Sequence, residues 1–235
     1  MSSYQNKGNN NYQSKKPKNP PVVVESTLGV DELELIQADS FTVISSVSEV
    51  SEEITDKLLP ALNRLKQKAY KMNYANDTRD ILAAKVFKKF EIYSDIYLPF
   101  KGFNKEAMVS SDEDEVLTAT LEEPSIKAHK LAAKYRYKNE RDEEGNIKYN
   151  SLNEFAKKFT ARDVHLFLGS KCATKIKFLI ILTNDTAEAP SEATYESTGS
   201  NVVFPIKLAD VLEIPVFNLN KPKRLDDLIE YIDSL

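Results

Sequence analysis

Glycine is scarce in this sequence. The 235 residues include six glycines, whereas typical usage of about 7% would give about sixteen. Loops that hold phosphate groups depend on glycine, because its backbone adopts positive φ values and lets a ligand approach closely. The shortage therefore counts against an ordinary nucleotide-phosphate site.

Cysteine and histidine are also scarce, which restricts the metal and disulfide chemistry of the chain. Cys172 is the single cysteine, so neither an internal disulfide nor a cysteine-based zinc site can form. The two histidines, His129 and His165, lie far apart in the sequence, which counts against a histidine-held catalytic metal. We expect no metal site and no cofactor, although Mg²⁺ held by carboxylates and a nucleotide ligand both stay open.

Long apolar runs are missing as well. No run approaches the length of about 18 residues that predicts a membrane span, and the N-terminus lacks the apolar core of a signal peptide. The net charge of −4 argues against a dedicated binder of duplex DNA, which normally has a basic surface. We therefore expect a cytoplasmic protein without a membrane partner and with at most weak affinity for nucleic acid.

Residues 1–32 are predicted to form a flexible N-terminal arm. This stretch is rich in Asn, Gln, Ser, Lys and Pro and has no acidic residue before Glu25, so it cannot bury enough apolar surface to fold alone. Two interpretations stay open: a disordered tail, or a tether (residues 1–30) that orders on a partner surface or contacts nucleic acid. The segment "PVVVES" could add a strand to a neighbouring sheet edge. The basic residues of the arm are Lys7, Lys15, Lys16 and Lys18.

Residues 33–235 are predicted to form a single α/β domain with an acidic insertion around 105–150. Stretches of strand character alternate with amphipathic helices, which is the pattern of a parallel sheet covered by helices. The stretch "KFLIILT" is apolar throughout, as a strand buried on both faces requires. The expected strands are 41–47, 72–77, 90–100, 177–183 and 216–219.

The helices are predicted from apolar spacing and from cap residues. An apolar stripe from Ile54 to Met72 predicts one helix, which Pro60 should kink or delay. Asp77 is the expected N-cap of the next helix. Two capping boxes, Ser151-x-x-Glu154 and Thr160-x-x-Asp163, predict two short helices, the second ending near Gly169. Further helices are expected at 125–137, at 202–212 and at the C-terminus.

Three stretches together resemble the SLOG superfamily, the Rossmann-like group of DNA-processing protein A and Lonely Guy. They are "YLPFKGFN" (97–104), "ARDVHLFLG" (161–169) and "FLIILT…GSNVVFPIKLADVLEIPVFNL" (178–219). The likeness covers roughly residues 40–220, and the nearest look-alikes are standalone members common in phage and bacterial genomes. It implies a Rossmann-like parallel sheet flanked by helices, frequent self-association, and, for a phage protein, a location in the host cytoplasm or the virion.

The ligand loops of that superfamily are altered in this chain. Residues 46–48 read "SVS" where the family tends to have Gly-Ser-Arg, and residues 74–80 read "YANDTRD" where it has Gly-Gly-Ala-x-Gly-Ala-Asp. Residues 200–202 replace Gly-Gly-Thr, with Gly199 one position early. Replacing a glycine of positive φ costs about 1 kcal/mol or more. The resemblance therefore implies loops of new shape and a largely dismantled phosphate site.

Three functions follow from these features. The first is a non-catalytic interaction or structural protein that docks through its arm into a larger assembly, such as a phage particle. The second is a sensor or sponge for a nucleotide-derived signal. The third is a Lonely Guy-like phosphoribohydrolase of nucleoside monophosphates. The catalytic candidates are Arg162, Asp80 and Arg79, and the ligand-binding candidates are Ser46, Asn76, Asp77, Gly199, Ser200 and Asn201.

Structural roles compete with functional ones at several of these positions. Arg162 could form a salt bridge near a helix start, and Asp80 could be a first-turn charge favoured by the helix dipole. His165 is expected to be partly buried, and Cys172 to be a small inert side chain. The side chains of Tyr74 and Phe204 are the candidates for plugging the crevice if it is closed.

Overall fold

The computed structural model describes residues 22–25, 34–77, 80–104, 119–137 and 140–235. The candidate Arg79, most of the predicted arm and the acidic stretch 105–118 therefore lie outside the described residues.

Five parallel strands form the main sheet in the order β4-β3-β2-β6-β7. The chain runs outward from β2 in one direction and then returns to its other side, which is the strand order of a Rossmann-like fold. This confirms the predicted fold class. The strands are β2 (Ser40–Ser45), β3 (Lys71–Tyr74), β4 (Ser94–Ile96), β6 (Phe178–Leu182) and β7 (Val216–Asn218), with a separate parallel pair, β1 (Ile36–Gln37) and β5 (Thr174–Lys175).

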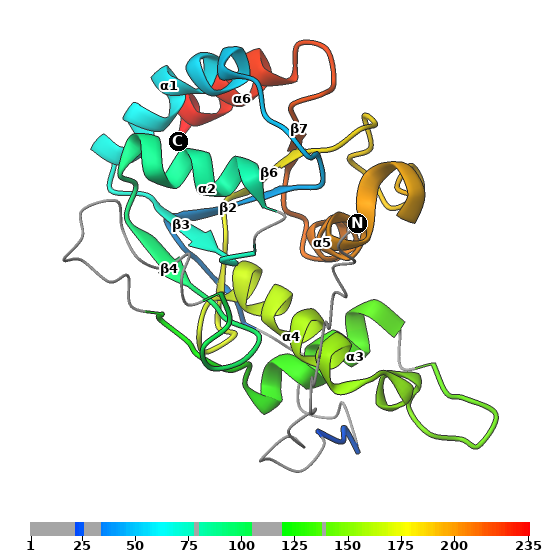
Figure 1. Cartoon of the computed structure of the whole chain (residues 1–235). Helices are drawn as coiled ribbons and strands as arrows, with labels where there is room; N and C mark the ends of the chain where they lie inside the picture. Colours follow the sequence, from blue (N-terminus) through cyan, green and yellow to red (C-terminus); the bar gives the residue numbers. More distant parts are fainter. Residues whose placement is uncertain (1–21, 26–33, 78–79, 105–118, 138–139) are drawn as a thin grey trace, which may run out of the picture.

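Helices cover both faces of this sheet (Figure 1). One face packs against α1 (Glu52–Gln67), α2 (Ile81–Phe90) and α6 (Arg224–Ser234). The other face packs against α3 (Ile126–Tyr137), α4 (Glu154–Leu168) and α5 (Ser200–Val211). Successive residues of β6 alternate between the two cores, Ile180 in the first and Ile181 in the second. Because both faces are covered, the strand is apolar throughout.

The first helix is shorter than the sequence predicts. Ser51 caps α1 by accepting the Ile54 N–H, and Pro60 lies inside the helix without ending it. The helix ends at Gln67 because Ala69 adopts a left-handed backbone with φ of 58°. The predicted extension of the stripe to Met72 is therefore wrong, since Met72 belongs to β3.

A single helix, α4, replaces the two short helices predicted from the capping boxes. Asn153 is the actual N-cap, accepting the Ala156 N–H at 2.8 Å. Thr160 lies inside the helix, where its hydroxyl donates to the Ala156 carbonyl at 2.7 Å instead of capping a new helix. The predicted end is confirmed: Gly169 terminates α4 with φ of 68°.

The region after β3 also departs from the prediction. Asp80, not Asp77, directly precedes α2, and its N–H donates to the Asp77 carbonyl at 2.9 Å. Helix α2 continues to Phe90, so the strand expected at 90–100 is reduced to β4. Two short turns complete the described elements: the 3₁₀ helix η2 (Lys148–Ser151) and the π-helical turn η3 (Tyr195–Gly199).

Pro60 gives a test of how α1 is stabilised. A proline inside a helix removes the amide donor for the carbonyl four residues earlier, here that of Asp56. We expect Pro60→Ala to raise the free energy of unfolding by about 1–2 kcal/mol, the restored hydrogen bond outweighing the greater entropy of the unfolded chain. Urea unfolding measures this. Asn63→Ala, exposed on the same helix, changes helix propensity alone and should shift stability by about 0.5 kcal/mol. An unchanged or lower stability of Pro60→Ala would contradict the account.

Candidate functional site

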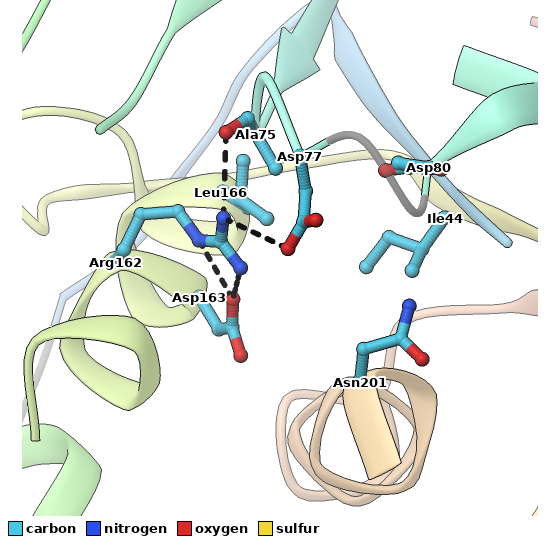
Figure 2. A pocket seen from close by; sticks show the side chains of 8 residues that line it. All are labelled: Ile44, Ala75, Asp77, Asp80, Arg162, Asp163, Leu166 and Asn201. Carbon is cyan, nitrogen blue, oxygen red and sulfur yellow. Dashed lines mark hydrogen bonds and ion pairs between the residues drawn. The ribbon is translucent and has the colours of Figure 1, made fainter. Parts of the chain in front are cut away.

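A small pocket lies at the carboxyl ends of β2 and β3, beside the first turn of α5 (Figure 2). The strand order reverses between β2 and β6, and open α/β sheets bind ligands at such a switch point. The cavity volume is about 10 Å³, which is close to the space of one water molecule. The lining residues are Ile44, Ala75, Asp77, Asp80, Arg162, Asp163, Leu166 and Asn201.

Arg162 is held by groups of the protein on one side of this pocket. Its Nε and Nη2 donate to Asp163 Oδ1 at 2.9 and 2.8 Å, and its Nη1 donates to the Ala75 carbonyl at 3.3 Å. Asp77 Oδ2 lies 4.0 Å from Nη1. The Arg162 side chain is 5% exposed, and its guanidinium stacks on the Phe159 ring at 5.2 Å. The predicted salt bridge is confirmed, although it lies within α4 and not near a helix start.

Asp80 is a buried acid with an altered pKa. Its Oδ1 accepts the N–H of Ser45 at 2.9 Å and the hydroxyl of Ser45 at 3.2 Å, while that hydroxyl accepts the Leu82 N–H at 3.1 Å. Burial disfavours the charged form and raises the pKa of Asp80 to about 8. Asp80 is therefore mostly protonated at neutral pH and could donate a proton. Burial also raises the pKa of Asp163, which the adjacent Arg162 opposes.

Gly199 lies where the loop before α5 meets the loop after β2. It precedes α5 with φ of 93°, and a Cβ atom at this position would lie 2.5 Å from the Cβ of Ser46. Because Gly199 has no side chain, the side chain of Ser46 can pack closely against it. Asn201 adds a second link, because its Nδ2 donates to the Ser45 carbonyl at 2.8 Å.

Asn76 supplies a left-handed residue in the loop after β3, with φ of 49°. Asparagine tolerates this conformation better than most residues. Its Nδ2 donates to the Asn104 carbonyl at 3.2 Å, and Asn104 Nδ2 donates to the Asn76 carbonyl at 2.7 Å. Two of the three loops altered relative to the SLOG pattern therefore still contain a positive-φ residue, Asn76 and Gly199.

The structure brings together some of the predicted site residues but not all. Four of them line the pocket: Asp77, Asp80, Arg162 and Asn201. Ser46 and Gly199 contact each other, and Asn76 binds Asn104. Ser200 is exposed and Arg79 lies outside the described residues. Tyr74 and Phe204 are buried but do not line the pocket.

Asp163 is the site residue that the sequence analysis missed. Its place in Thr160-x-x-Asp163 suggested a helix cap, whereas the structure makes it the main partner of Arg162. The available signal was the Arg-Asp pair inside an otherwise apolar helical stretch, 161–168. Two adjacent opposite charges among apolar residues indicate a buried ion pair.

His165 and Cys172 have structural environments. His165 is fully buried, more than the partial burial expected, and burial lowers its pKa. Its Nε2 accepts the Ser125 N–H at 3.0 Å, so Nδ1 carries the proton and donates to the Gly169 carbonyl at 2.8 Å. Cys172 is buried as well, and burial raises the pKa of its thiol to about 11. Both features agree with the prediction of an inert cysteine, because they disfavour the reactive thiolate.

Within the described ranges, no group of three or more His, Cys, Asp or Glu side chains is arranged to hold a metal ion. None of the helices described combines the length and the apolar composition that crossing a bilayer requires.

Comparison with known proteins gives no match to a family model, to a curated protein or to a solved structure. Membership of the SLOG superfamily therefore stays a prediction, and the fold is established by the strand order alone.

Asp80 makes the stability of the protein depend on pH. Its pKa is about 8 in the folded chain against an ordinary 3.8, so its contribution is complete below about pH 4 and is lost as the pH rises through about 8. Asp80→Asn keeps an acceptor for both Ser45 bonds and has no proton to lose. Relative to wild type, we expect this variant to gain up to about 1 kcal/mol per pH unit between about pH 5 and 7. Groups shared by both chains, such as His129, cancel in this difference. Urea unfolding across this range measures it, and a constant difference would show that Asp80 is ionised when folded.

The contact between Gly199 and Ser46 can be tested by adding a methyl group. Gly199→Ala combines an unfavourable φ with overpacking, so we expect a loss of about 2–4 kcal/mol of stability. Gly145→Ala is the matched control, because Gly145 has φ of 83° with no atom within 4 Å of the added Cβ, and it should lose about 1 kcal/mol. Ser46→Gly in the Gly199→Ala background should restore part of the loss. Equal losses for the two alanine variants would exclude the predicted contact.

Proposed function

We propose that this chain is a non-catalytic interaction or structural protein, built on a nucleotide-binding type of frame, that docks into a larger assembly through its N-terminal arm. The observation that carries the proposal is that the Arg162 guanidinium is already hydrogen-bonded to groups of the protein itself. This side chain is a catalytic candidate and the cation that lines the pocket, and its charge is balanced by Asp163, with Ala75 and Asp77 close by.

Two further features of the pocket support a role without a bound nucleotide. The space that Gly199 leaves open is filled by Ser46, so the position where backbone amides would approach a phosphate is taken. The cavity of about 10 Å³ is far below the several hundred Å³ of ordinary ligand pockets. These two features support a function that needs no bound nucleotide.

The arm supports the docking part of the proposal. Its four lysines lie before residue 19, and no acid precedes Glu25, although the whole chain has a net charge of −4. Residues 22–25 are bound to the folded domain, so the basic stretch is attached at a defined place on its surface. An acidic protein surface is the partner that this charge favours. A phage particle or phage–host complex as the assembly rests on the SLOG resemblance.

A nucleotide-signal sensor is the second candidate, because the pocket lies at the switch point of the sheet. The phosphoribohydrolase is the third, and would use Asp80 as a proton donor beside Arg162. Both require a ligand to displace the internal partners of Arg162, whereas the docking function does not.

Thermal unfolding of the full chain with nucleoside monophosphates, ADP-ribose or inorganic phosphate separates these functions. A ligand at about 100 times its Kd adds about 2.7 kcal/mol to stability, which would raise the Tm by roughly 5–10 °C. We expect no change in Tm with any of the three. A rise that disappears in Arg162→Gln would refute the proposal and favour the sensor.

The docking itself is tested with a full-length variant in which Lys7, Lys15, Lys16 and Lys18 are replaced by serine. Photocrosslinking in the cells that make the protein, from a photoreactive amino acid placed at Tyr12 in both chains, should join the wild-type arm to one partner at fixed stoichiometry. The variant should lose that crosslink while unfolding at the same Tm as wild type. An unchanged crosslink pattern would remove the arm from the docking function.

A further inference from the structure

Residues 22–25 are bound by a set of three side chains, Asn150, Glu154 and Lys157, which we call the arm cradle. Asn150 forms hydrogen bonds with both backbone groups of Val24: its Oδ1 accepts the Val24 N–H at 2.9 Å, and its Nδ2 donates to the Val24 carbonyl at 3.0 Å. A neighbouring β-strand would make the same pair of hydrogen bonds. The side chain of one asparagine thus replaces a strand edge.

The other two cradle residues bind Val22 in the same way. Glu154 Oε2 accepts the Val22 N–H at 3.1 Å, and Lys157 Nζ donates to the Val22 carbonyl at 3.0 Å. Lys157 and Glu154 also pair with each other at 2.9 Å. Residues two apart in an extended chain present their backbone groups on the same edge. The cradle therefore recognises the backbone of positions i and i+2 of an extended segment.

Side-chain burial fixes which face of the segment enters the cradle. Val24 is 2% exposed and belongs to the core shared by α3, α4 and α5, whereas Val23 is 59% exposed. The segment is thus selected by one aliphatic side chain and by four hydrogen bonds to its main chain. A short extended peptide with valine at this position satisfies every one of these contacts.

Buried groups beneath the cradle hold it in shape. The Tyr149 hydroxyl donates to the Lys157 carbonyl at 2.8 Å and contacts His129 Nδ1 at 2.7 Å. Tyr149 is fully buried and lies next to Asn150 in η2. Because η2 and α4 are joined in this way, the three cradle residues are positioned independently of the arm.

We propose that the arm cradle also binds residues 22–25 of a second copy of this chain, so that copies exchange arms. The recognition involves the main chain and one valine, and nothing in it requires the two parts to belong to one molecule. An empty cradle would leave Lys157, which is 4% exposed with the arm in place, and the amide of Asn150 without the carbonyl partners that the arm supplies. A filled cradle is therefore favoured over an empty one, and protein concentration determines whether the arm comes from the same copy or from another.

The proposed partner is a second copy of this chain, because every copy carries a segment that fits the cradle of every other copy. This inference deepens the proposed function, and rests on it for the idea that the arm engages a protein partner. Head-to-tail exchange of arms would link successive copies within an assembly.

Two full-length variants test the exchange by complementation. Val24→Asp places a charge in the apolar position and disables the arm while leaving the cradle intact. Asn150→Ala disables the cradle while leaving the arm intact. In sedimentation velocity at high micromolar concentration, we expect each variant alone to be monomeric and an equimolar mixture to form a heterodimer, while wild type self-associates. Two folded variants, checked by circular dichroism, whose mixture stays monomeric would overturn the proposal.

A peptide provides a second measurement that does not need Asn150→Ala to fold. A fluorescent peptide of residues 19–26 should bind the Val24→Asp chain, whose own arm no longer competes, at least tenfold more tightly than it binds wild type. The same peptide carrying the Val24→Asp change should not bind. Absence of binding by the natural peptide contradicts arm exchange and leaves the docking function, which the lysine variant tests separately, untouched.

Discussion

The ion pair between Arg162 and Asp163 is the interaction on which the closed state of the site depends. A buried guanidinium is very unfavourable without partners, so Arg162 must be satisfied within the protein. Asp163 provides the opposite charge, and the loop after β3 provides the Ala75 carbonyl and the nearby Asp77 carboxylate. Arg162, held in place by Asp163, therefore joins α4 to the loop after β3 through Ala75 and Asp77, as Figure 2 shows.

Around this pair, each loop at the switch point is tied to another part of the protein. Ser46 occupies the space beside Gly199, and Asn201 binds the Ser45 carbonyl. Asp80 accepts two hydrogen bonds from Ser45, one from its N–H and one from its hydroxyl. These contacts use the polar groups that would face a ligand in a nucleotide-binding protein. The polar loops of this Rossmann-like frame thus stabilise one another, which supports the proposal of a function without a bound nucleotide.

The sequence predicts the frame better than the details of the site. Apolar runs such as 177–183 have one compatible environment, a strand covered on both faces, and Gly169 ends α4 as expected. Thr160 misleads because a threonine hydroxyl can bond back to the preceding turn as readily as it caps a helix. Asp163 is missed because its spacing from Thr160 suggests a capping box, whereas in the structure it pairs with Arg162. The cradle is not predictable either, since "PVVVES" indicates strand pairing, and the partner groups of Val22 and Val24 are side chains more than a hundred residues away.

The most direct test of the central claim is an NMR titration that follows the Arg162 Nε–H group. Because this group donates to Asp163 inside the protein, its resonance should exchange slowly with solvent. It should also keep its chemical shift when inorganic phosphate or a nucleoside monophosphate is added to saturation. A resonance that exchanges rapidly and moves on addition of either ligand would show that Arg162 is available to bind phosphate, and would contradict the account.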